Sequence, residues 1–576
     1  MLKNKEIAQK LRLIAKYLEM KGVDYKPFAY ERAADSIMAL DRSVASIYEE
    51  EGREGIEKIS GVGKAIADKL EELILTGEIE HLQKLKDKLP VDLENLLRVE
   101  GLGPKSIKKL YDNLEVVDLK TLKEKAQDGS VASLDGFGEK TQQNVLEAIQ
   151  FLEKDEGKWS LGEVLPIAEE IYTKLESLEE VKRISFAGSL RRKKEVVGDV
   201  DILVSASKTE KVMNTFTSFE SVEKVLGQGE TKSSIRLREG FDVDLRVVNM
   251  KSFGSALQYF TGSKSHNIKV RKIAISDEMK LNEYGLFKDG KKIAGKTEEG
   301  IYSKLGMSYT PPEIRENRGE VEEALKGRDF NLCELEDIKG DLHTHTTWTG
   351  GSQTVKEMAL AAAEMGYEYI GIADHTKYLQ IENGLDEKEL KEQREEIKKV
   401  NQKLKEEGVN ITVLQGCEAN ILKDGSLDIT DEALSQLDYV IAGIHSHFKL
   451  PKEEMTERLI KAIKNPEVDI ISHPTGRLIK KRESLSLDVE KIIDAANKEG
   501  VVLEINSSPH RLDLSDRYIK RCVENEQLLA INSDAHHKDQ LKNIEFGVGQ
   551  ARRGWAESGD ILNSKNLKEL LNIFNQ

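Results

Sequence analysis

The sequence predicts a multidomain α/β protein with three dissimilar parts. Residues 1–155 are helical by pattern and carry one Gly-x-Gly turn three times. Residues 156–320 mix predicted strands and helices, which indicates an α+β domain. Residues 338–576 repeat an apolar run followed by a helical pattern seven times, which predicts a distorted (β/α)7 barrel. A chain of 576 residues is long enough to bury several such cores.

Composition narrows the class of protein. The net charge of −16 counts against wholesale electrostatic binding to DNA, although a local groove can differ from the whole chain. Cys333, Cys417 and Cys522 are scattered and odd in number, so a disulfide scaffold is not expected and a reducing cytoplasm fits. No apolar run approaches the roughly 18 residues of a membrane span. We therefore expect a cytoplasmic protein that does not bind membranes.

The first part repeats a turn in which an apolar residue precedes Gly-x-Gly and a helix with a nearby lysine follows. Two glycines allow a tight turn and close backbone approach, and the helix N-terminus offers N–H groups to a phosphate. The turns resemble helix–hairpin–helix motifs, which bind the DNA backbone without reading sequence. Glycine-capped turns that merely connect helices are the alternative, which three copies in one segment disfavour. The glycines concerned are Gly61, Gly63, Gly101, Gly103, Gly136 and Gly138.

The middle part is organised around two carboxylates on one predicted strand. Asp199 and Asp201 are two positions apart and point to one face, while Val200 and Ile202 point into a core. Two carboxylates on one face resist simultaneous ionisation unless a cation lies between them. Mg²⁺ is the natural guest, because it is held by one or two carboxylates together with substrate phosphates. A surface strand with an incidental Asp-x-Asp is the alternative.

A second strand supplies a third carboxylate. Residues 234–248 read as a hairpin strand on which Asp242, Asp244 and Arg246 share a face. Together with the first pair, this supports in-line phosphoryl transfer with two metals. One metal would activate the attacking hydroxyl, and the other would neutralise the leaving pyrophosphate. A Gly-Ser turn with two arginines precedes the first strand, at residues 188–192, and offers donors for a triphosphate.

These motifs resemble the palm of a family X DNA polymerase, within the nucleotidyltransferase fold, and the resemblance covers residues 1–320. It implies that Asp199, Asp201 and Asp244 are catalytic and bind Mg²⁺ or Mn²⁺, whereas Asp242 is not assigned a role. It also implies gapped or primer–template DNA and deoxynucleoside triphosphates as partners. The further residues that it assigns to substrate binding are Gly188, Ser189, Arg192, Gly198, Tyr259, Phe260, Gly262, Asn267 and Arg271.

Within that set, Tyr259–Ser263 resembles the family's turn that packs against the incoming sugar, and Asn267 and Arg271 match positions that touch the nascent base pair. In relatives with a lyase domain, a lysine forms a Schiff base with an abasic sugar, and Lys69 matches its position. A solvated helix lysine, or one that touches a 5′-phosphate, is an equal alternative, because the attack on the sugar requires a lowered pKa.

The last part concentrates metal-competent residues at predicted strand ends. Nine of the 11 histidines lie between His343 and His537, each group following a short apolar run. Functional groups at the carboxyl ends of successive strands are typical of a barrel active site. Imidazole and carboxylate ligands together suit Zn²⁺, Mn²⁺ or Fe²⁺ better than Mg²⁺ alone.

This pattern resembles the polymerase-and-histidinol-phosphatase (PHP) phosphoesterase domain. The resemblance implies up to three metal ions, which would generate a hydroxide and hydrolyse a phosphate ester. One departure is that Gly350 occupies a position where the family motif has Asp, so one metal is expected to be weaker or lost. The side chains of His447, His510, Arg511 and His537 could instead hold substrate phosphate. The implied ligands are His343, His345, His375, Glu418, His445, His473, Asp534 and His536.

Both halves together resemble the bacterial and archaeal family X polymerases that carry a PHP domain. The resemblance implies gap filling in base-excision repair, 3′→5′ exonuclease trimming, abasic-site cleavage, other repair enzymes as partners and a monomer. In one alternative, the polymerase half only docks DNA for a metal-dependent nuclease, which the three intact Asp positions disfavour. In another, the barrel is a scaffold or a small-molecule phosphatase, which Gly350 keeps open.

The expected domains follow from these motifs. The segment between the two halves is charged and lacks strong periodicity, so it reads as a tether that lets two lobes move. The expected boundaries are 1–85 (lyase-like, first hairpin), 86–155 (fingers-like, two further hairpins), 156–255 (palm), 256–320 (nucleotide pocket), 321–337 (linker) and 338–576 (PHP domain).

Overall fold

The computed structural model describes residues 4–574 except residues 24, 39, 41, 100, 155 and 156. Glu100, part of the second glycine motif, therefore lies outside the described residues. The chain divides into two compact units. The first comprises Met1–Glu156 with Lys480–Arg482, and the second comprises Gly157–Ile479 with Glu483–Gln576.

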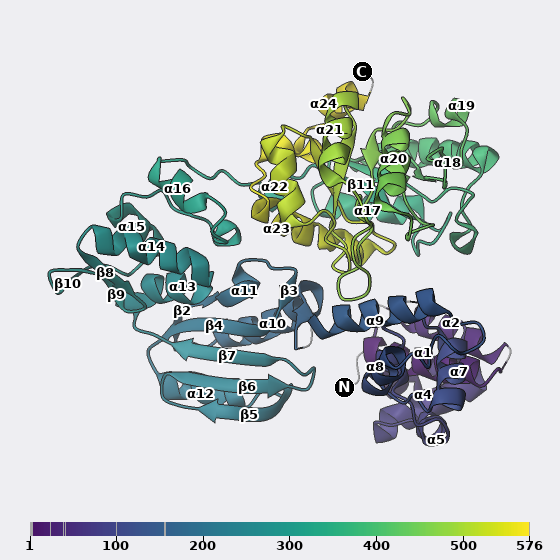
Figure 1. Cartoon of the computed structure of the whole chain (residues 1–576), viewed down its shortest axis with the longest axis horizontal. Coiled ribbons are helices and arrows are strands. Elements are labelled where there is room, and N and C mark those ends of the chain that lie inside the picture. The colour runs from purple at the N-terminus through teal and green to yellow at the C-terminus, as the bar shows by residue number, and fades with distance from the viewer. Residues whose placement is uncertain are drawn as a thin grey trace. The chain divides into compact units, whose positions relative to one another are not determined.

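The first unit is built of helices (Figure 1). Helix α1 buries Ile7, Leu11, Ile14 and Leu18, an apolar stripe at helical spacing. The helices are α1 (Asn4–Met20), α2 (Lys26–Met38), α3 (Val44–Glu57), α4 (Lys64–Thr76), α5 (Glu80–Lys88), α6 (Leu93–Leu96), α7 (Pro104–Leu114), α8 (Leu119–Gln127) and α9 (Glu139–Lys154).

One hydrophobic core runs through this whole unit. It extends from Ile7 to Ile149, and the Tyr17 hydroxyl of α1 donates a hydrogen bond to the carbonyl of Val91 at 2.9 Å. The expected boundary at residue 85 therefore does not separate two cores. Helical periodicity shows which face of a helix is buried but not which helices share a core, so the sequence could not place this boundary.

The palm in the second unit is a five-stranded sheet of order β2-β4-β7-β6-β5. Strands β4 and β7 are parallel, and the other neighbours are antiparallel. Helices α10 and α12 pack on one face, where Val200 and Ile202 join the core. The bounds are β1 (Trp159–Ser160), α10 (Leu161–Glu176), β2 (Val181–Phe186), α11 (Gly188–Arg191), β3 (Val196–Val197), β4 (Asp199–Ala206), α12 (Thr209–Thr217), β5 (Val222–Gln228), β6 (Lys232–Leu237) and β7 (Asp242–Val247).

Helices and a small sheet follow the palm. The sheet has the order β10-β9-β8 and is antiparallel. Helix α13 packs back onto the palm, because Phe253, Ala256 and Leu257 share a cluster with Ala187 and Leu203. The bounds are η1 (Met250–Ser252), α13 (Phe253–Thr261), α14 (Lys264–Ser276), β8 (Met279–Asn282), β9 (Gly285–Lys288), β10 (Lys291–Ala294), α15 (Glu298–Lys304), η2 (Pro312–Ile314) and α16 (Glu320–Leu325).

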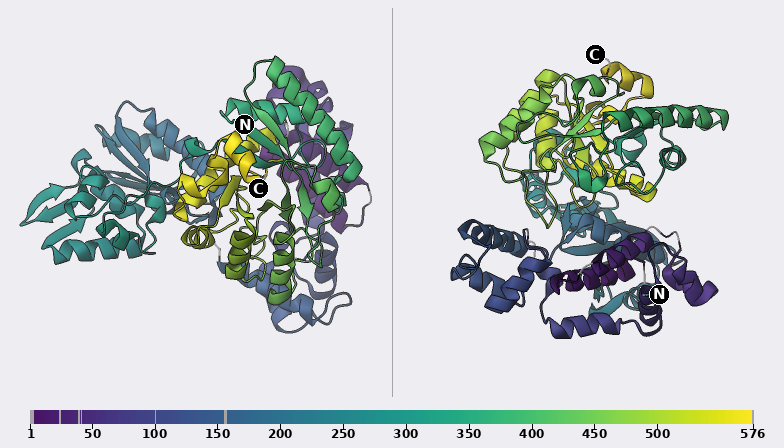
Figure 2. Two further views of the ribbon diagram at one scale, coloured as in Figure 1. Left: turned by 90° about the horizontal axis from the view of Figure 1, so that it is seen from above. Right: turned by 90° about the vertical axis from the view of Figure 1, so that its right-hand side faces the viewer.

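The C-terminal part is a barrel of parallel strands with helices outside (Figures 1 and 2). Single bridges from Thr344 to Ala535 and from His375 to Glu418 join its two sheets. The strands are β11 (Gly340–Thr344), β12 (Tyr369–Ile372), β13 (Thr412–Gln415), β14 (Glu418–Asn420), β15 (Ile441–Gly443), β16 (Ile470–Ile471), β17 (Val502–Asn506) and β18 (Leu529–Asn532).

Helices connect these strands except β13 and β14, which two residues join, and the prediction of a multidomain α/β protein is confirmed. The α-helices of the barrel are α17 (Val355–Glu364), α18 (Glu387–Glu406), α19 (Asp431–Leu434), α20 (Lys452–Ile463), α21 (Val489–Glu499), α22 (Asp516–Glu524), α23 (Ile544–Arg553) and α24 (Leu567–Phe574). The 3₁₀ turns are η3 (Leu335–Asp337), η4 (Gln380–Glu382), η5 (Lys538–Asn543), η6 (Ser558–Asp560) and η7 (Leu562–Ser564).

The segment expected to be a tether is packed. Val321 of α16 is buried against the subdomain around α14, and Leu332 packs with Trp555 of the barrel. In addition, Leu512 and Phe546 of the barrel lie in the core of the palm. The interpretation of 321–337 as a free linker is therefore wrong. The buried apolar residues of this segment are divided among several cores, so they leave no periodic pattern in the sequence.

None of the helices in the described part of the chain combines the length and the apolar character that a membrane span needs.

Candidate active sites

The first site lies on the palm sheet, where two parallel strands present carboxylates side by side. In the register of β4 and β7, Asp199 faces Asp242 and Asp201 faces Asp244. Strand alternation points all four side chains to the face opposite the buried Val200. The structure therefore brings the three carboxylates predicted to be catalytic together with the fourth, which was assigned no role.

Hydrogen bonding distinguishes the two carboxylates of β7. Asp244 accepts a hydrogen bond from Ser234 Oγ at 2.5 Å and lies 2.7 Å from Lys232 Nζ. Asp242 instead accepts from both Nε and Nη2 of Arg236, at 2.7 and 2.9 Å. Because a bidentate arginine already holds Asp242, this carboxylate is the less available metal ligand.

The charges of this cluster are unbalanced without a cation. Burial and the neighbouring Asp199 and Asp244 raise the pKa of Asp201 to about 6. Burial and the same kind of repulsion, mainly from Asp244, raise the pKa of Asp199. Carboxylates that resist ionisation beside one another fit a divalent cation, which removes the repulsion. The three carboxylates Asp199, Asp201 and Asp244 thus fit the expected Mg²⁺ or Mn²⁺.

The Gly-Ser turn lies directly against these carboxylates. Gly188 has a φ of +59°, and a Cβ atom there would lie 2.5 Å from Oδ2 of Asp201, so only glycine fits. Ser189 follows in α11, and Gly198 directly precedes β4 in an exposed position. The turn is thereby fixed beside the carboxylates.

The two arginines of the turn are engaged differently. Arg191 forms a bidentate pair with the buried Glu298, at 3.0 and 2.6 Å, which also binds Arg315. Both of its terminal nitrogens donate to Glu298, so its expected role as a donor to a triphosphate stays a prediction. Arg192 pairs with Glu316 at 3.0 Å and donates to the carbonyl of Thr261, which links it to the predicted sugar-binding turn.

The predicted nucleotide pocket is assembled around the end of α13. Tyr259 is 37% exposed, and its ring meets Phe260 edge-on at 5.1 Å. The side chain of Asn267 is buried and donates to the carbonyl of Tyr259 at 2.7 Å, so Asn267 positions this turn. Arg271 donates to the carbonyl of Asn267 at 3.2 Å, and Gly262 ends α13 with a φ of +71°. These residues gather as the sequence predicted, although Asn267 points into the protein.

The three glycine hairpins of the first unit share one geometry. In each, the first glycine has a left-handed backbone, with φ of +74° at Gly61, +89° at Gly101 and +80° at Gly136. The second glycine is extended at Gly63 and Gly103, where it begins α4 and α7 without a side-chain cap, and Gly138 directly precedes α9. A Cβ atom at these second glycines would meet nothing within 4 Å, so their backbone is open to a ligand.

Lys69 lies on helix α4 behind the first hairpin. Its amine donates to the carbonyl of Ala65 at 2.8 Å within the same helix. Burial and the charges of Lys69 and of neighbouring lysines, including Lys21 and Lys26, lower the pKa of His81. These cations would suit contact with a 5′-phosphate as well as attack of Lys69 on an abasic sugar. The lyase role of Lys69 therefore stays a prediction.

The second site lies inside the barrel, where all eight predicted metal ligands converge. Glu418 is the hub, because one of its oxygens is 2.9 Å from Nδ1 of His375 and the other is 3.0 Å from Nε2 of His473 and 3.2 Å from Nε2 of His445. His343 and His345 also adjoin Glu418, Asp534 adjoins His345, and His536 adjoins Asp534.

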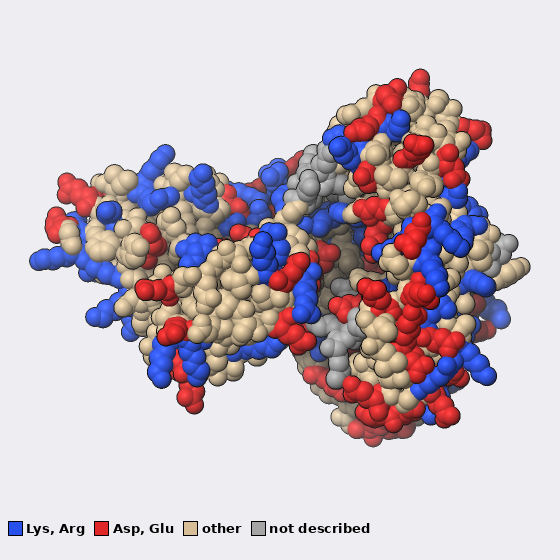
Figure 3. Space-filling model, turned by 90° about the horizontal axis from the view of Figure 1, so that it is seen from below, with Lys and Arg blue, Asp and Glu red and all other residues tan. Residues whose placement is uncertain are grey.

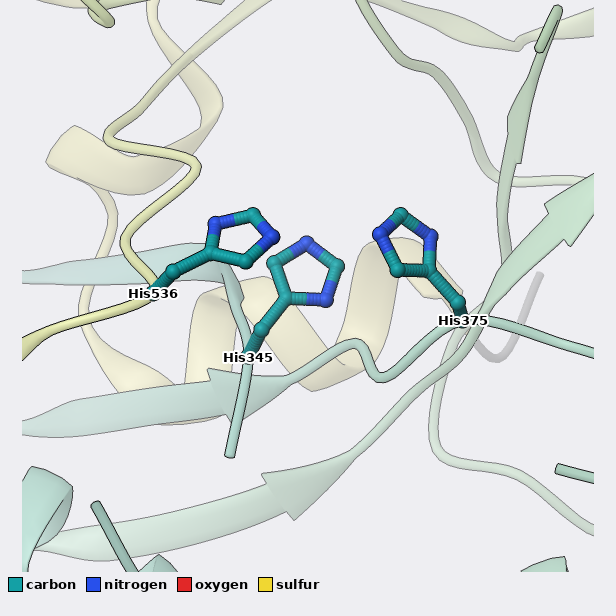
Figure 4. Close-up of side chains that lie close together, drawn as sticks. All are labelled: His345, His375 and His536. Carbon is teal, nitrogen blue, oxygen red and sulfur yellow. The ribbon is translucent and has the colours of Figure 1, made fainter. Parts of the chain in front are cut away.

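Three overlapping groups of these ligand atoms could each hold a metal ion. Figure 4 shows the group made only of imidazoles, in which the ring of His345 lies between those of His375 and His536. Its centroid is 4.3 Å from that of His375 and 4.1 Å from that of His536. The other groups are His343 with His345 and Asp534, and His375 with Glu418 and His445.

The donor atoms fit metal ions. Nε2 of His343 and both ring nitrogens of His345 are buried without a hydrogen-bond partner among the described residues. Burial and the neighbouring His536 and His375 hold the pKa of His345 well below its usual value, so its lone pairs stay available. Buried, unpartnered imidazole nitrogens facing carboxylates are what a transition-metal site requires.

Sequence reasoning missed the residues that hold these ligands in place. Glu504 of β17 accepts from Nδ1 of His343 and from the backbone N–H of His473, both at 2.7 Å. Oδ1 of Asn420, in β14, lies 2.7 Å from Nδ1 of His445. Such partners fix the ring orientation of metal ligands. The carboxylate in the apolar strand run 501–505 was the available signal for Glu504.

Gly350, the departure from the family motif, lies at the edge of the imidazole group. A Cβ atom there would be 2.2 Å from Oε2 of Glu382 and 3.4 Å from Cδ2 of His536. No local pattern indicates that a glutamate from the turn η4 takes up this space.

The charge of the surface is mixed despite the net charge of −16. Figure 3 shows Lys and Arg interspersed with Asp and Glu on the face that it draws, rather than a continuous acidic surface. Whole-chain charge therefore does not argue against local contacts with a phosphate backbone.

The fold and the two sites define the class as a nucleotidyltransferase joined to a metal-binding phosphoesterase barrel. Family models match the chain in the same order. They are a helix-hairpin-helix domain (residues 2–79), a SAM-like helix-hairpin-helix tandem (93–150), the DNA polymerase beta palm (162–238), the DNA polymerase beta thumb (256–316) and the PHP domain (341–508).

Comparison with curated proteins agrees with the family models. The chain is 37% identical over 571 residues to the DNA polymerase/3′-5′ exonuclease PolX of Bacillus subtilis (strain 168), covering 98% of both chains. It is also 31% identical over 228 residues to a probable phosphatase of Acetivibrio thermocellus, covering 37% of this chain and 83% of that protein. The chain thus belongs to the family X DNA polymerases that carry a PHP domain.

Proposed function

We propose that this polymerase fills short DNA gaps in base-excision repair and that its barrel is a metal-dependent 3′→5′ exonuclease. The observation that carries the proposal for synthesis is the parallel register of β4 and β7, which juxtaposes Asp201 and Asp244. The proposal for trimming is supported by the eight converging ligands of the barrel and by the name of the Bacillus subtilis relative.

In extension, the primer 3′ oxygen bonds to the α-phosphorus of a deoxynucleoside triphosphate, and the bond to the bridging oxygen breaks and releases pyrophosphate. Asp199, Asp201 and Asp244 would hold Mg²⁺ or Mn²⁺, which lowers the pKa of the attacking hydroxyl and neutralises the leaving group. Lys232 and the hydroxyl of Ser234 orient Asp244 for this role. The turn at residues 188–192 and the pocket around Tyr259 orient the nucleotide.

In trimming, water attacks the phosphorus of the last phosphodiester, and the bond to the 3′ oxygen of the preceding nucleotide breaks and releases a deoxynucleoside monophosphate. The barrel ligands would hold up to three Mn²⁺, Zn²⁺ or Fe²⁺ ions, which supply a hydroxide at neutral pH. Glu504 holds His343 in orientation, and Arg511, with Nε 3.6 Å from Oδ2 of Asp534, would meet a phosphate.

The first unit would dock the DNA backbone through the open glycine turns. Lyase chemistry at Lys69, abasic-site cleavage, a cytoplasmic location, a monomeric state and contacts with other repair enzymes stay predictions. They are supported by membership in the family and by the cations around Lys69.

The test uses a 5′-labelled primer on one-nucleotide-gapped DNA with Mg²⁺ or Mn²⁺, with and without the four deoxynucleotides. We expect extension by one residue, lost roughly 10³-fold in Asp244→Ala because a ligand that acts in the transition state is removed. Asp242→Ala, on the same strand, is the matched control and should keep extension. Shortening without nucleotides should disappear in His343→Ala.

Shortening without extension would reject the polymerase assignment and favour the alternative in which the polymerase half docks DNA for a nuclease. Extension without shortening would reject the exonuclease assignment and leave the barrel as a scaffold or as a phosphatase of small molecules. The similarity to the probable phosphatase of Acetivibrio thermocellus favours the phosphatase among these.

A further inference from the structure

The imidazole group of the barrel differs from the other two in charge. The group of His343, His345 and Asp534 and the group of His375, Glu418 and His445 each contain a carboxylate. The group of His345, His375 and His536 contains only imidazoles, which are neutral when they bind a metal. A divalent cation in this group would thus lack a compensating anion from the residues that form it.

A carboxylate nevertheless lies at this group. The turn η4 follows His375 in the connection between β12 and α18, and it carries Glu382. Oε2 of Glu382 is 2.2 Å from the position that a Cβ atom of residue 350 would take, and Cδ2 of His536 is 3.4 Å from the same position. The carboxylate and the imidazole therefore border the same small space above the backbone of Gly350.

Glycine is what admits the carboxylate. Any side chain at position 350 would begin 2.2 Å from Oε2 of Glu382, closer than non-bonded atoms approach, so one of the two would have to move. The φ angle of Gly350 is not in the left-handed region, so the backbone does not require glycine for its conformation. The consequence of glycine at position 350 is therefore the space that it leaves for the carboxylate of Glu382.

In the part of the chain that the structure describes, the carboxylate of Glu382 has no other partner that would keep it from a metal ion. It is partly buried, yet none of the described residues donates a hydrogen bond to its side chain or pairs with it. Asp374, one residue before His375, instead accepts from Thr346, Thr349 and Gln393. A partly buried, unpartnered carboxylate beside metal-competent imidazoles costs free energy unless a cation compensates it.

We propose that Glu382 is a metal ligand, which adds a carboxylate beside His536 to the imidazole group of His345, His375 and His536 and makes it a mixed site for Mn²⁺, Zn²⁺ or Fe²⁺. The inference rests on the proposed metal-dependent function of the barrel. It means that Gly350 does not cost the enzyme a metal but leaves space for a ligand supplied by another segment. The mixed donor set suits these ions, and the carboxylate provides the missing negative charge.

The test counts bound metal directly. The full-length protein, Glu382→Gln and Glu382→Ala are stripped with a chelator, reloaded with Mn²⁺ and analysed by equilibrium dialysis with elemental analysis. Each variant is expected to lose about one ion per chain, or to bind its weakest ion roughly 10- to 100-fold less tightly. Glu392→Gln, an exposed glutamate of α18 that pairs with Lys388, is the matched control and should bind like the parent.

A rescue variant separates ligation from folding. In the Glu382→Ala background, Gly350→Asp places a carboxylate in the vacated space, and it should restore the lost ion. Equal metal content and affinity in Glu382→Gln and the parent would overturn the proposal while leaving the barrel a metal site. A loss that Gly350→Asp does not restore, with a lowered unfolding temperature of the metal-free variant, would also overturn it. A parent that binds no metal would instead reject the proposed function itself.

Discussion

The palm and the barrel lie in one compact unit and are both suited to phosphate chemistry, yet their sites are built in opposite ways. The palm presents carboxylates on one face of a sheet, where Asp199 is exposed. The barrel encloses imidazoles and carboxylates, and both His343 and His345 are fully buried. The palm ligands repel one another and need a cation for charge balance, whereas the barrel ligands combine neutral donors with a few anions.

This difference explains which ions each site suits. An open face of oxygen ligands leaves positions for water and substrate phosphates, as Mg²⁺ requires. A closed set of imidazoles, held by partners such as Glu504 and Asn420, favours transition-metal ions and retains them. We therefore expect the two sites of this chain to respond to different ions.

Removal and replacement of metals should give the largest contrast between the sites. After exhaustive dialysis against a chelator, Mg²⁺ alone is expected to restore extension of a gapped primer but to leave shortening at least about tenfold below its starting rate. Mn²⁺ should restore both. The measurement is the labelled-primer assay with each ion titrated separately. If Mg²⁺ restored both activities equally, the two sites would not differ in the way that their ligands indicate.

A smaller effect, on the binding of the incoming nucleotide, should follow from the contact between the barrel and the palm. Arg553 of the barrel helix α23 is 4% exposed and donates to the carbonyl of Arg192 at 2.7 Å. It also lies 3.3 Å from Glu316, which pairs with Arg192, and 2.5 Å from Asp516. A barrel residue thus supports the loop that is predicted to hold the triphosphate.

Arg553→Lys keeps the charge but cannot bridge all these partners. We expect the KM for the incoming nucleotide to rise about fivefold, as for a loss of roughly 1 kcal/mol of positioning, with kcat less affected and shortening unchanged. Arg552→Lys is the matched control, because Arg552 pairs with Glu313 and Glu334 instead. The same rise in both variants would assign the effect to the interface in general and not to Arg192.

The smallest effect is on stability and concerns Asp469, at the end of the barrel remote from the metal ligands. Burial raises the pKa of Asp469, which accepts from the backbone of Val440, to about 7. The folded-state pKa is above the unfolded value, so the folded state binds the proton more tightly, and stability falls as pH rises from about 4 through 7. Asp469→Asn should therefore raise the unfolding temperature by a few degrees at pH 8 but hardly at pH 4. An equal change at both pH values would contradict this origin.

Local sequence pattern was sufficient to predict many of the residues in both sites. Strand alternation placed Asp199 and Asp201 on one face, because the period of two is a property of the backbone itself. The glycine hairpins were readable because left-handed backbone at Gly61, Gly101 and Gly136 requires that residue. The predicted histidine ligands were readable because they lie at or just after the carboxyl ends of apolar strands.

What the sequence by itself determined is thus the kind of chemistry and the residues that carry it. Only the tertiary structure decided how they are partnered. Strand register pairs Asp244 with Asp201 and leaves Asp242 to Arg236, and closure of the barrel brings Glu504 to His343 and Glu382 over Gly350. Periodicity and strand ends are set by neighbouring residues, whereas register and closure depend on packing between segments far apart in the chain, which no local pattern records.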